Sequence, residues 1–110
     1  MERFNELFED LQESLDTANE YRRIASSIGS RAPRFKQKLL EAAAEIESMV
    51  DEVKTQYDIM IEDDISSEDV ENSWEYVTDI KNDLLELVQT KQAQVSKILK
   101  WYYSTYELRG

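Results

Sequence analysis

The sequence predicts an all-α fold, specifically an antiparallel three-helix bundle with coiled-coil-like packing. Two observations predict it. Only two Gly and one Pro occur among 110 residues, too few for the many tight turns of a β-sandwich or barrel. Apolar residues also recur at heptad spacing over three long stretches, as in amphipathic helices. Because a chain of this size builds one ordinary core, we expect residues 1–110 to form a single domain.

The first predicted helix spans residues 3–28 and is followed by the sequence GSRAP. Gly29 suits the residue after a helix end, and Pro33 suits the first turn of the next helix. The connection is therefore short, and the first two helices should run antiparallel. The apolar stripe that predicts this first helix consists of Phe4, Leu7, Leu11, Ala18, Tyr21, Ala25 and Ile28.

The second and third predicted helices span residues 33–62 and 67–108. An apolar stripe from Phe35 to Met60 predicts the second helix, and EDDISSEDVE then interrupts the period. Ser66 or Ser67 suits an N-cap, since acids follow in the first turn where the helix dipole favours them. The third stripe begins at Val70 and contains no Gly or Pro before the last residue of the chain.

The third helix is longer than its neighbours. Counting from residue 67 beside residue 62, it reaches the level of Pro33 near residue 96. About ten residues, or roughly 15 Å of helix, should then extend past the bundle. Alternatively, the helix breaks near QTKQAQ, and the C-terminal segment folds over the bundle as a short fourth helix. Both arrangements place this segment beside the first turn.

Charge is distributed unevenly along this acidic chain, whose net charge is −11. Residues 21–40 carry six basic residues and no acid, whereas residues 41–89 carry sixteen acids and two lysines. Residues 90–110 carry four basic residues, including Arg109, and only Glu107 as an acid. Because the two basic blocks meet at the first turn, we predict a rod with one positive, aromatic tip and a negative remainder.

This tip supplies the candidate partner-binding residues. Basic and aromatic side chains together can hold an acidic segment of a partner protein, or contact phosphates and stack on bases. The alternative is a solvated surface in which Glu20, Glu41 and Glu45 balance the basic residues. The candidates are Arg22, Arg23, Arg31, Arg34, Lys36, Lys38, Lys97, Lys100, Trp101 and Tyr103.

Four other residues are candidates for a core or oligomer seam. Ile98, Tyr102 and Tyr106 recur at helical spacing, which predicts burial in the core or against a second copy. Lys91 interrupts the apolar stripe. It either reaches out to solvent, pairs with Glu20 or Glu41, or marks a kink, and it can fix register or oligomeric state.

Several functions are disfavoured by the composition. The chain has no Cys and no His, so it lacks thiolate chemistry, the usual general base and the commonest metal ligand. The acidic segment around residues 62–71 lacks the glycine-centred frame of an EF-hand loop. We therefore expect no enzyme, metal, cofactor or small-molecule substrate. MERFNELFEDLQESL lacks signal-peptide features, and no stretch is apolar enough to span a membrane, so we expect a cytoplasmic protein that does not bind membranes.

The sequence thus predicts a non-enzymatic protein–protein interaction module, such as an adaptor, a chaperone-like subunit or a structural subunit, with a protein partner at the tip. A homodimer through the overhanging aromatic helix is one form of this hypothesis. A second hypothesis is a nucleic-acid-associated protein that binds through the Arg/Lys tip. A third is an acidic nucleic-acid mimic that inhibits a basic protein.

Two family resemblances are confined to short or general features. Tyr103 and Glu107 resemble the Tyr-x-x-x-Asp/Glu signal that ends secreted WXG100 proteins, and the three-helix plan resembles a spectrin repeat. The chain lacks the Trp-x-Gly turn of the WXG100 proteins, because Trp74 lies inside a predicted helix. No family is assigned from the sequence.

Overall fold

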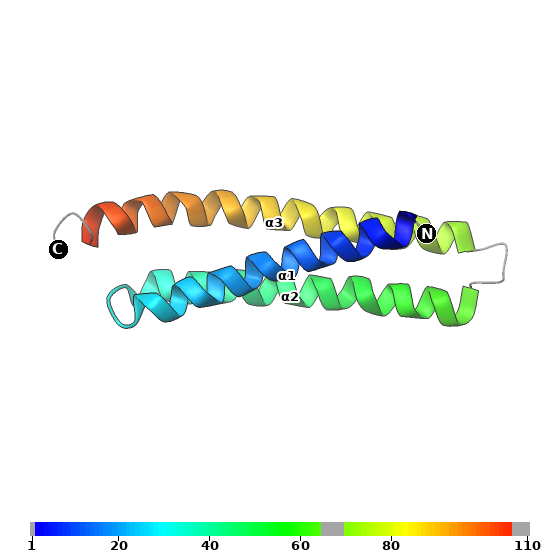
Figure 1. Ribbon diagram of the computed structural model, residues 1–110, viewed down its shortest axis with the longest axis horizontal. Coiled ribbons are helices and arrows are strands. Elements are labelled where there is room, and N and C mark those ends of the chain that lie inside the picture. The colour runs from blue at the N-terminus through cyan, green and yellow to red at the C-terminus, as the bar shows by residue number, and fades with distance from the viewer. Residues whose placement is uncertain (1, 65–69, 107–110) are drawn as a thin grey trace.

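The computed structural model describes residues 2–64 and 70–106, and the side chains of residues 4–62 and 71–105. It contains three long helices, α1 (Glu2–Ile28), α2 (Pro33–Ile59) and α3 (Val70–Tyr106), and a π-helical turn, η1 (Met60–Asp64), that continues α2 (Figure 1). The described ranges contain no strand, so the all-α prediction is confirmed. The predicted N-cap at Ser66 or Ser67 lies outside the described residues, as do Glu107 and Arg109.

The helices form an elongated bundle of 62 × 18 × 18 Å. α1 and α2 run antiparallel, α2 and α3 run antiparallel, and the α1–α2 turn lies at the same end as the C-terminus (Figure 1). α1 crosses the bundle obliquely, from beside α3 at its N-terminal end to a position over α2 at the turn. An ion pair between Lys81 Nζ and Asp10 Oδ2, 3.2 Å apart, joins α1 to α3 near the N-terminal end.

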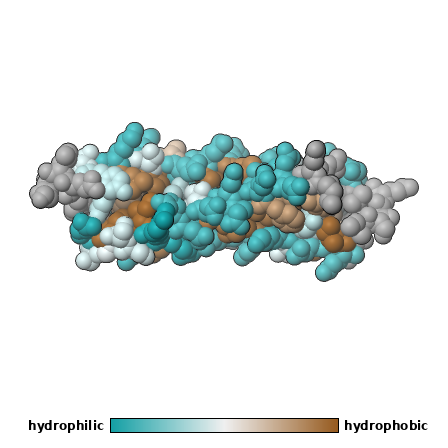
Figure 2. Space-filling view, viewed as in Figure 1, coloured by the Kyte–Doolittle hydropathy of each residue, from teal (hydrophilic) through white to brown (hydrophobic). Residues whose placement is uncertain are grey.

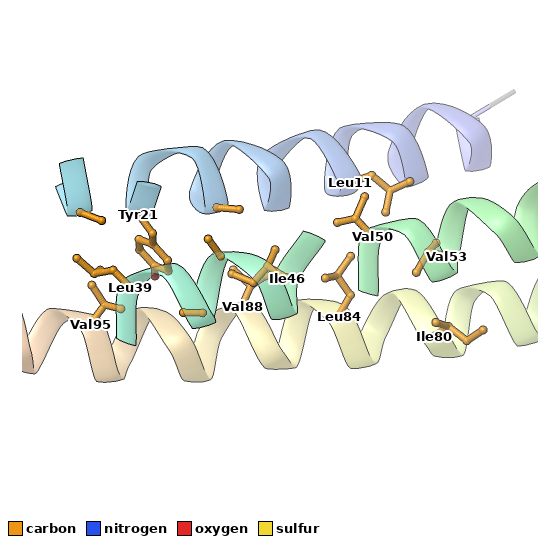
Figure 3. Close-up of a cluster of buried hydrophobic side chains, with 14 of the residues drawn as sticks. Leu11, Tyr21, Leu39, Ile46, Val50, Val53, Ile80, Leu84, Val88 and Val95 are labelled. Carbon is orange, nitrogen blue, oxygen red and sulfur yellow. The ribbon is translucent and has the colours of Figure 1, made fainter. Parts of the chain in front are cut away.

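The core follows the heptad stripes (Figure 3). Small residues on the α1 and α2 stripes, among them Ala18 and Ala43, are fully buried and let these helices approach closely. Ser14 is a polar residue at a core position of the α1 heptad pattern, between Leu11 and Ala18; it is buried, and its Oγ donates to the carbonyl oxygen of Asp10 at 2.9 Å. The largest fully buried apolar side chains are Leu39, Ile46, Val50, Val53, Val77 and Leu84.

The predicted turn between α1 and α2 is present. Gly29 adopts a φ of 63°, the left-handed conformation that glycine tolerates best. The backbone N–H of Arg31 donates to the carbonyl oxygen of Ile28 at 3.4 Å. Pro33 is the first residue of α2, after Ala32 at the N-cap position. These local signals end α1 and start α2 within a few residues.

A break in α3 near residues 89–94 was one expectation, and it is wrong. α3 is one continuous helix from Val70 to Tyr106, so no fourth helix forms from this segment. No Gly or Pro interrupts it. The stripe resumes at Val95, which is buried, and Lys91 satisfies its charge by pairing with Glu45 on α2.

The expected overhang of ten residues is also wrong. Counting places residue 84 opposite Glu45, whereas Glu45 pairs with Lys91, seven positions further along α3. The counting assumed that residue 67 lies beside residue 62, but the observed register places each α2 residue against a later part of α3. As a result Ile98 and Tyr102 still pack against the bundle, and only the last turn of α3 lies beyond Tyr102.

Candidate functional site: the basic tip

The beginning of α2 and the end of α3 meet at one end of the rod. The rings of Phe35 and Tyr102 lie 5.7 Å apart at 48°, and Tyr102 is buried. The Arg31 guanidinium lies 5.9 Å from the centre of the Tyr102 ring, a cation–π contact. The two predicted basic blocks therefore lie together. We call this region the basic tip; it comprises Arg31, Arg34, Lys36, Lys38, Lys97, Lys100, Trp101 and Tyr103.

A groove of about 510 Å³ opens between α2 and α3 at the basic tip. Its floor is apolar, and the side chains of four cations border it. No Asp or Glu is among the residues that line it, so an occupant meets apolar surface and positive charge together. We call it the tip groove; it is lined by Arg31, Ala32, Pro33, Arg34, Phe35, Lys38, Lys97, Ile98 and Trp101.

Two of the predicted partner-binding arginines are balanced by acids. Arg22 pairs with Glu47 on α2, with Nε and Oε2 3.4 Å apart. The hydrogen bond and the charge of Glu47 raise the pKa of Arg22. Arg23 pairs with Glu20 on its own helix. Neither arginine lines the tip groove, so for these two the solvated-surface alternative describes what the structure shows.

The remaining basic side chains differ in their partners. Arg31 hydrogen-bonds to the carbonyl oxygens of Ser27 and Ile28, at 3.5 Å in each case. The other basic side chains of the tip lie on α2 and α3, and no described acid forms an ion pair with them. These unpaired cations are Arg34, Lys36, Lys38, Lys97 and Lys100.

The start of α2 is locally unfavourable for positive charge. The Ala32 N-cap provides no side-chain hydrogen bond, and the first turn contains no acid. It contains Arg34 instead, with Lys36 and Lys38 in the next residues. The exposed N–H groups make a helix N-terminus partially positive, so cations there are repelled and an anion is attracted. A negatively charged group beside Arg34 would relieve this repulsion.

The aromatic residues of α3 divide between the core and the surface. Tyr102 is buried and Ile98 is half-buried, as expected for a core seam, whereas the side chain of Tyr106 lies outside the described residues. Trp101 and Tyr103 remain 53% and 44% exposed. Trp101, one of the candidate partner-binding residues, lies at the wall of the tip groove.

Lys91, the fourth predicted seam residue, lies half-buried between α2 and α3. Its Nζ is 2.7 Å from Oε2 of Glu45, so its ion-pair partner is neither Glu20 nor Glu41, although Glu41 lines the same pocket. The difference follows from the register of α3. The pair joins α2 to α3, and α3 continues as an α-helix on both sides of Lys91.

The opposite end of the rod is aromatic too, which the sequence interpretation missed. Phe4 packs edge-on against Tyr57 at 5.7 Å and against Trp74 at 5.4 Å, and Phe8 packs against Tyr57 at 5.3 Å. Three helices contribute to this cluster. All four residues are visible in the sequence near predicted helix ends, but their meeting depends on the register of α3.

A second groove, of about 260 Å³, lies between α2 and α3 at this end. Ile59 and Tyr76 expose large apolar side chains beside it. The charged residues within two positions of its lining residues are acids except for Lys54; the acids are Asp58, Glu62, Glu71, Glu75 and Asp79. We call this end the acidic end and its groove the acidic groove; the lining residues are Gln56, Ile59, Met60, Asn72, Ser73, Tyr76 and Val77.

Comparison with protein-family models, curated proteins and solved structures found no significant match. Within residues 2–64 and 70–106, no helix is both long and apolar enough to cross a membrane. The same residues contain no cluster of three or more acidic side chains arranged to hold a metal ion. The function is therefore argued from the physical chemistry of the basic tip.

Proposed function

We propose that this protein is a protein–protein interaction module that binds an acidic segment of a partner through the tip groove. The segment carries at least one bulky apolar side chain, which enters the groove, and carboxylates that contact the surrounding cations. The observation that supports this most directly is the composition of the groove, in which Pro33, Phe35 and Ile98 form apolar surface beside Arg34, Lys38 and Lys97.

The cost of the charges at the start of α2 supports the same proposal. Arg34 in the first turn destabilises the helix that carries it, because it adds positive charge to the positive end, and Lys36 and Lys38 follow where this effect fades. Residues that break a local rule of this kind tend to occur at functional sites, where a ligand compensates the cost. An acidic segment docked on the tip offsets the repulsion between these cations and the positive end of α2, and its carboxylates interact favourably with the helix dipole.

The apolar groove favours a protein over a nucleic acid as the partner. Single-stranded nucleic acid is bound along tracks of cations with stacking surfaces spaced for successive bases. Here Arg22 and Arg23 are engaged with glutamates, so the described cations without an ion pair are concentrated at the basic tip, apart from Lys54 on α2. Bulky side chains such as Trp101, exposed beside charged residues, are typical of protein interfaces.

A peptide titration tests the proposal. The probe is a short fluorescein-labelled peptide of Glu and Asp with a central Leu-Phe pair, followed by fluorescence anisotropy at low salt. We expect binding that weakens as salt rises, since exposed charges are screened. Replacing Leu-Phe by Ala-Ala should weaken binding because it removes the apolar contact with the groove. Replacing the acids by Gln and Asn should weaken it because it removes the contacts with the cations.

Matched variants separate the tip from general electrostatics. Lys97→Glu and Lys38→Glu should each weaken peptide binding by about tenfold, or about 1.4 kcal/mol. Lys54→Glu makes the same charge change at an exposed lysine of α2 outside the tip groove and should leave binding within about twofold. Equal losses in all three variants would contradict the proposal. Tip-dependent binding of an oligonucleotide without binding of the peptide would replace it by the nucleic-acid hypothesis.

A further inference from the structure

Exposed large apolar side chains gather at the two ends of the rod. Among the described side chains, five large hydrophobics are exposed, and none lies in the middle of the bundle. Those at the basic tip stand beside unpaired cations, and those at the acidic end stand beside carboxylates. The two ends are therefore alike in apolar character and opposite in charge. The five residues are Phe8, Ile59, Tyr76, Trp101 and Tyr103.

The tip groove and the acidic groove lie on the same side of the rod. Both open between α2 and α3. Lys38 of the tip groove and Ile59 of the acidic groove are three heptads apart on α2, and Trp101 and Ser73 are four heptads apart on α3. Residues that share a heptad position face the same side in helices packed as a left-handed bundle.

From this placement we propose that a second copy of the chain docks antiparallel on the α2–α3 side. A two-fold axis across the rod brings each tip groove onto the acidic groove of the other copy. The same contact then forms twice, and the assembly closes at two copies. This inference rests on the proposed function, because it assigns the acidic end of the chain itself as one occupant of the tip groove.

The pairing covers exposed apolar side chains and brings opposite charges together at both ends of the rod. Ile59 and Tyr76 are covered, and the carboxylates of Glu75 and Asp79 come to the end that carries Lys97 and Lys100. Each end is only about 18 Å wide, so each contact buries on the order of several hundred Å², at the low end of the range for stable complexes. The dimer is therefore weak and salt-sensitive, and an external acidic partner competes with it for the tip groove.

Sedimentation velocity over a concentration series tests the dimer. At low salt the wild-type mass should rise from one copy toward two and stop there, at concentrations up to about 1 mM. The tip variant Lys38→Glu/Lys97→Glu and the end variant Glu75→Lys/Asp79→Lys each lose both contacts when alone, so each should stay monomeric. All four side chains are exposed, and circular dichroism confirms that both variants fold.

Mixing the two variants provides the decisive readout. The intact tip of the end variant fits the intact acidic end of the tip variant, so the equimolar mixture should recover a two-copy species. Its second contact pairs the introduced carboxylates of the tip variant with the introduced lysines of the end variant, which are again opposite in charge. A control variant, Glu9→Lys/Glu13→Lys, makes the same charge change as the end variant on exposed residues of α1 and should dimerise like the wild type.

Three results would overturn the inference: a wild type that remains monomeric, a mass that grows past two copies, or a tip variant that dimerises as the wild type does. Its failure is distinguishable from failure of the proposed function. A monomeric wild type that still binds the acidic peptide removes only the dimer. A dimer that depends on the tip, in a protein that binds no peptide, removes only the external partner.

Discussion

The two ends of the rod use aromatic residues for different purposes. At the acidic end, Phe4, Phe8, Tyr57 and Trp74 pack against one another and join all three helices. At the basic tip, the contact between Phe35 and Tyr102 joins two helices, while Trp101 and Tyr103 stay exposed. Figure 2 shows one face of the molecule coloured by residue hydropathy. The cluster of rings at the acidic end holds the fold together, and the rings exposed at the tip are available for contact with a partner.

This difference teaches that aromatic content alone does not mark a binding site. What distinguishes the tip is that its exposed rings lie beside cations without ion pairs among the described residues, at a helix start that disfavours them. At the acidic end, Tyr76 is exposed as well, but four rings contact one another across three helices, and each such contact contributes about 0.5–1.5 kcal/mol beyond area burial.

The largest expected effect is on stability, from Trp74→Ala. This change removes an indole that contacts Phe4 and Tyr57 from the junction of three helices. We expect the free energy of unfolding in urea to fall by about 3 kcal/mol. Trp101→Ala is the matched control, because its indole is 53% exposed; it should cost less than about 1 kcal/mol. Equal losses would show that both ends serve the fold.

Much of this architecture could be predicted because its signals are local. Gly29 and Pro33 mark a helix end and a helix start through their own backbone preferences, and heptad spacing identifies the buried face. The register of α3 could not be predicted in this way. It depends on the path of the chain from Asp64 to Val70, and the period of the stripe carries no information about that path.

The candidate site, too, could be predicted only in part. The basic tip follows from which turn joins which helices, so the placement of Lys97 and Lys100 near Arg34 could be anticipated. Whether a cation is paired could not, because Arg22 and Glu47 are 25 positions apart and meet only through the alignment of α1 with α2. The acidic-end cluster was missed for a related reason, since the contact of Phe4 with Trp74 requires the register of α3.

Arg34→Glu should have the next largest effect, and it should act in opposite directions on stability and binding. A carboxylate in the first turn of α2 complements the helix dipole where a cation now opposes it. We expect unfolding in urea to require about 1 kcal/mol more free energy, while the acidic peptide binds more weakly. Gln37→Glu, one turn further along α2, is the control: it replaces the hydrogen bond to Glu41 with a like-charge pair, so it should not raise stability and should weaken binding less than Arg34→Glu. A loss of both stability and binding would mean that Arg34 supports the fold.

A smaller effect is expected from two tyrosines, one in the half of the rod near the basic tip and one at the acidic end. Burial raises the pKa of the Tyr21 phenol above its ordinary value of 10.0. Burial, and then the charge of Asp58, raises that of Tyr57. Above pH 10 the unfolded chain releases these protons while the folded chain keeps them, so stability is present below that pH and falls as the pH rises.

For Tyr21→Phe, the free energy of unfolding in urea should therefore fall less than in the wild type between about pH 9 and about pH 11. No described residue hydrogen-bonds to the buried Tyr21 hydroxyl, so the variant should also gain about 0.5 kcal/mol at neutral pH. Tyr57→Phe should also reduce the loss of stability at alkaline pH. Added salt should make this effect of Tyr57→Phe smaller and leave that of Tyr21→Phe unchanged, because salt screens the charge of Asp58 but does not change burial. Identical salt responses of the two variants would contradict these causes.

The smallest effect is expected in the middle of the rod, where Lys91 pairs with Glu45. Glu45 is 53% exposed in its side chain, so the pair is close to water, and Glu45→Gln should change the free energy of unfolding by less than about 0.5 kcal/mol. Lys91→Met, which completes the apolar stripe, should be neutral or stabilising. A polar residue retained in a seam without a gain in stability can instead fix the alignment of helices. Lys91→Met should then leave stability intact but broaden the NMR resonances of α3, because α3 would exchange between neighbouring registers. Unchanged spectra would show that Lys91 does not fix the alignment of the helices.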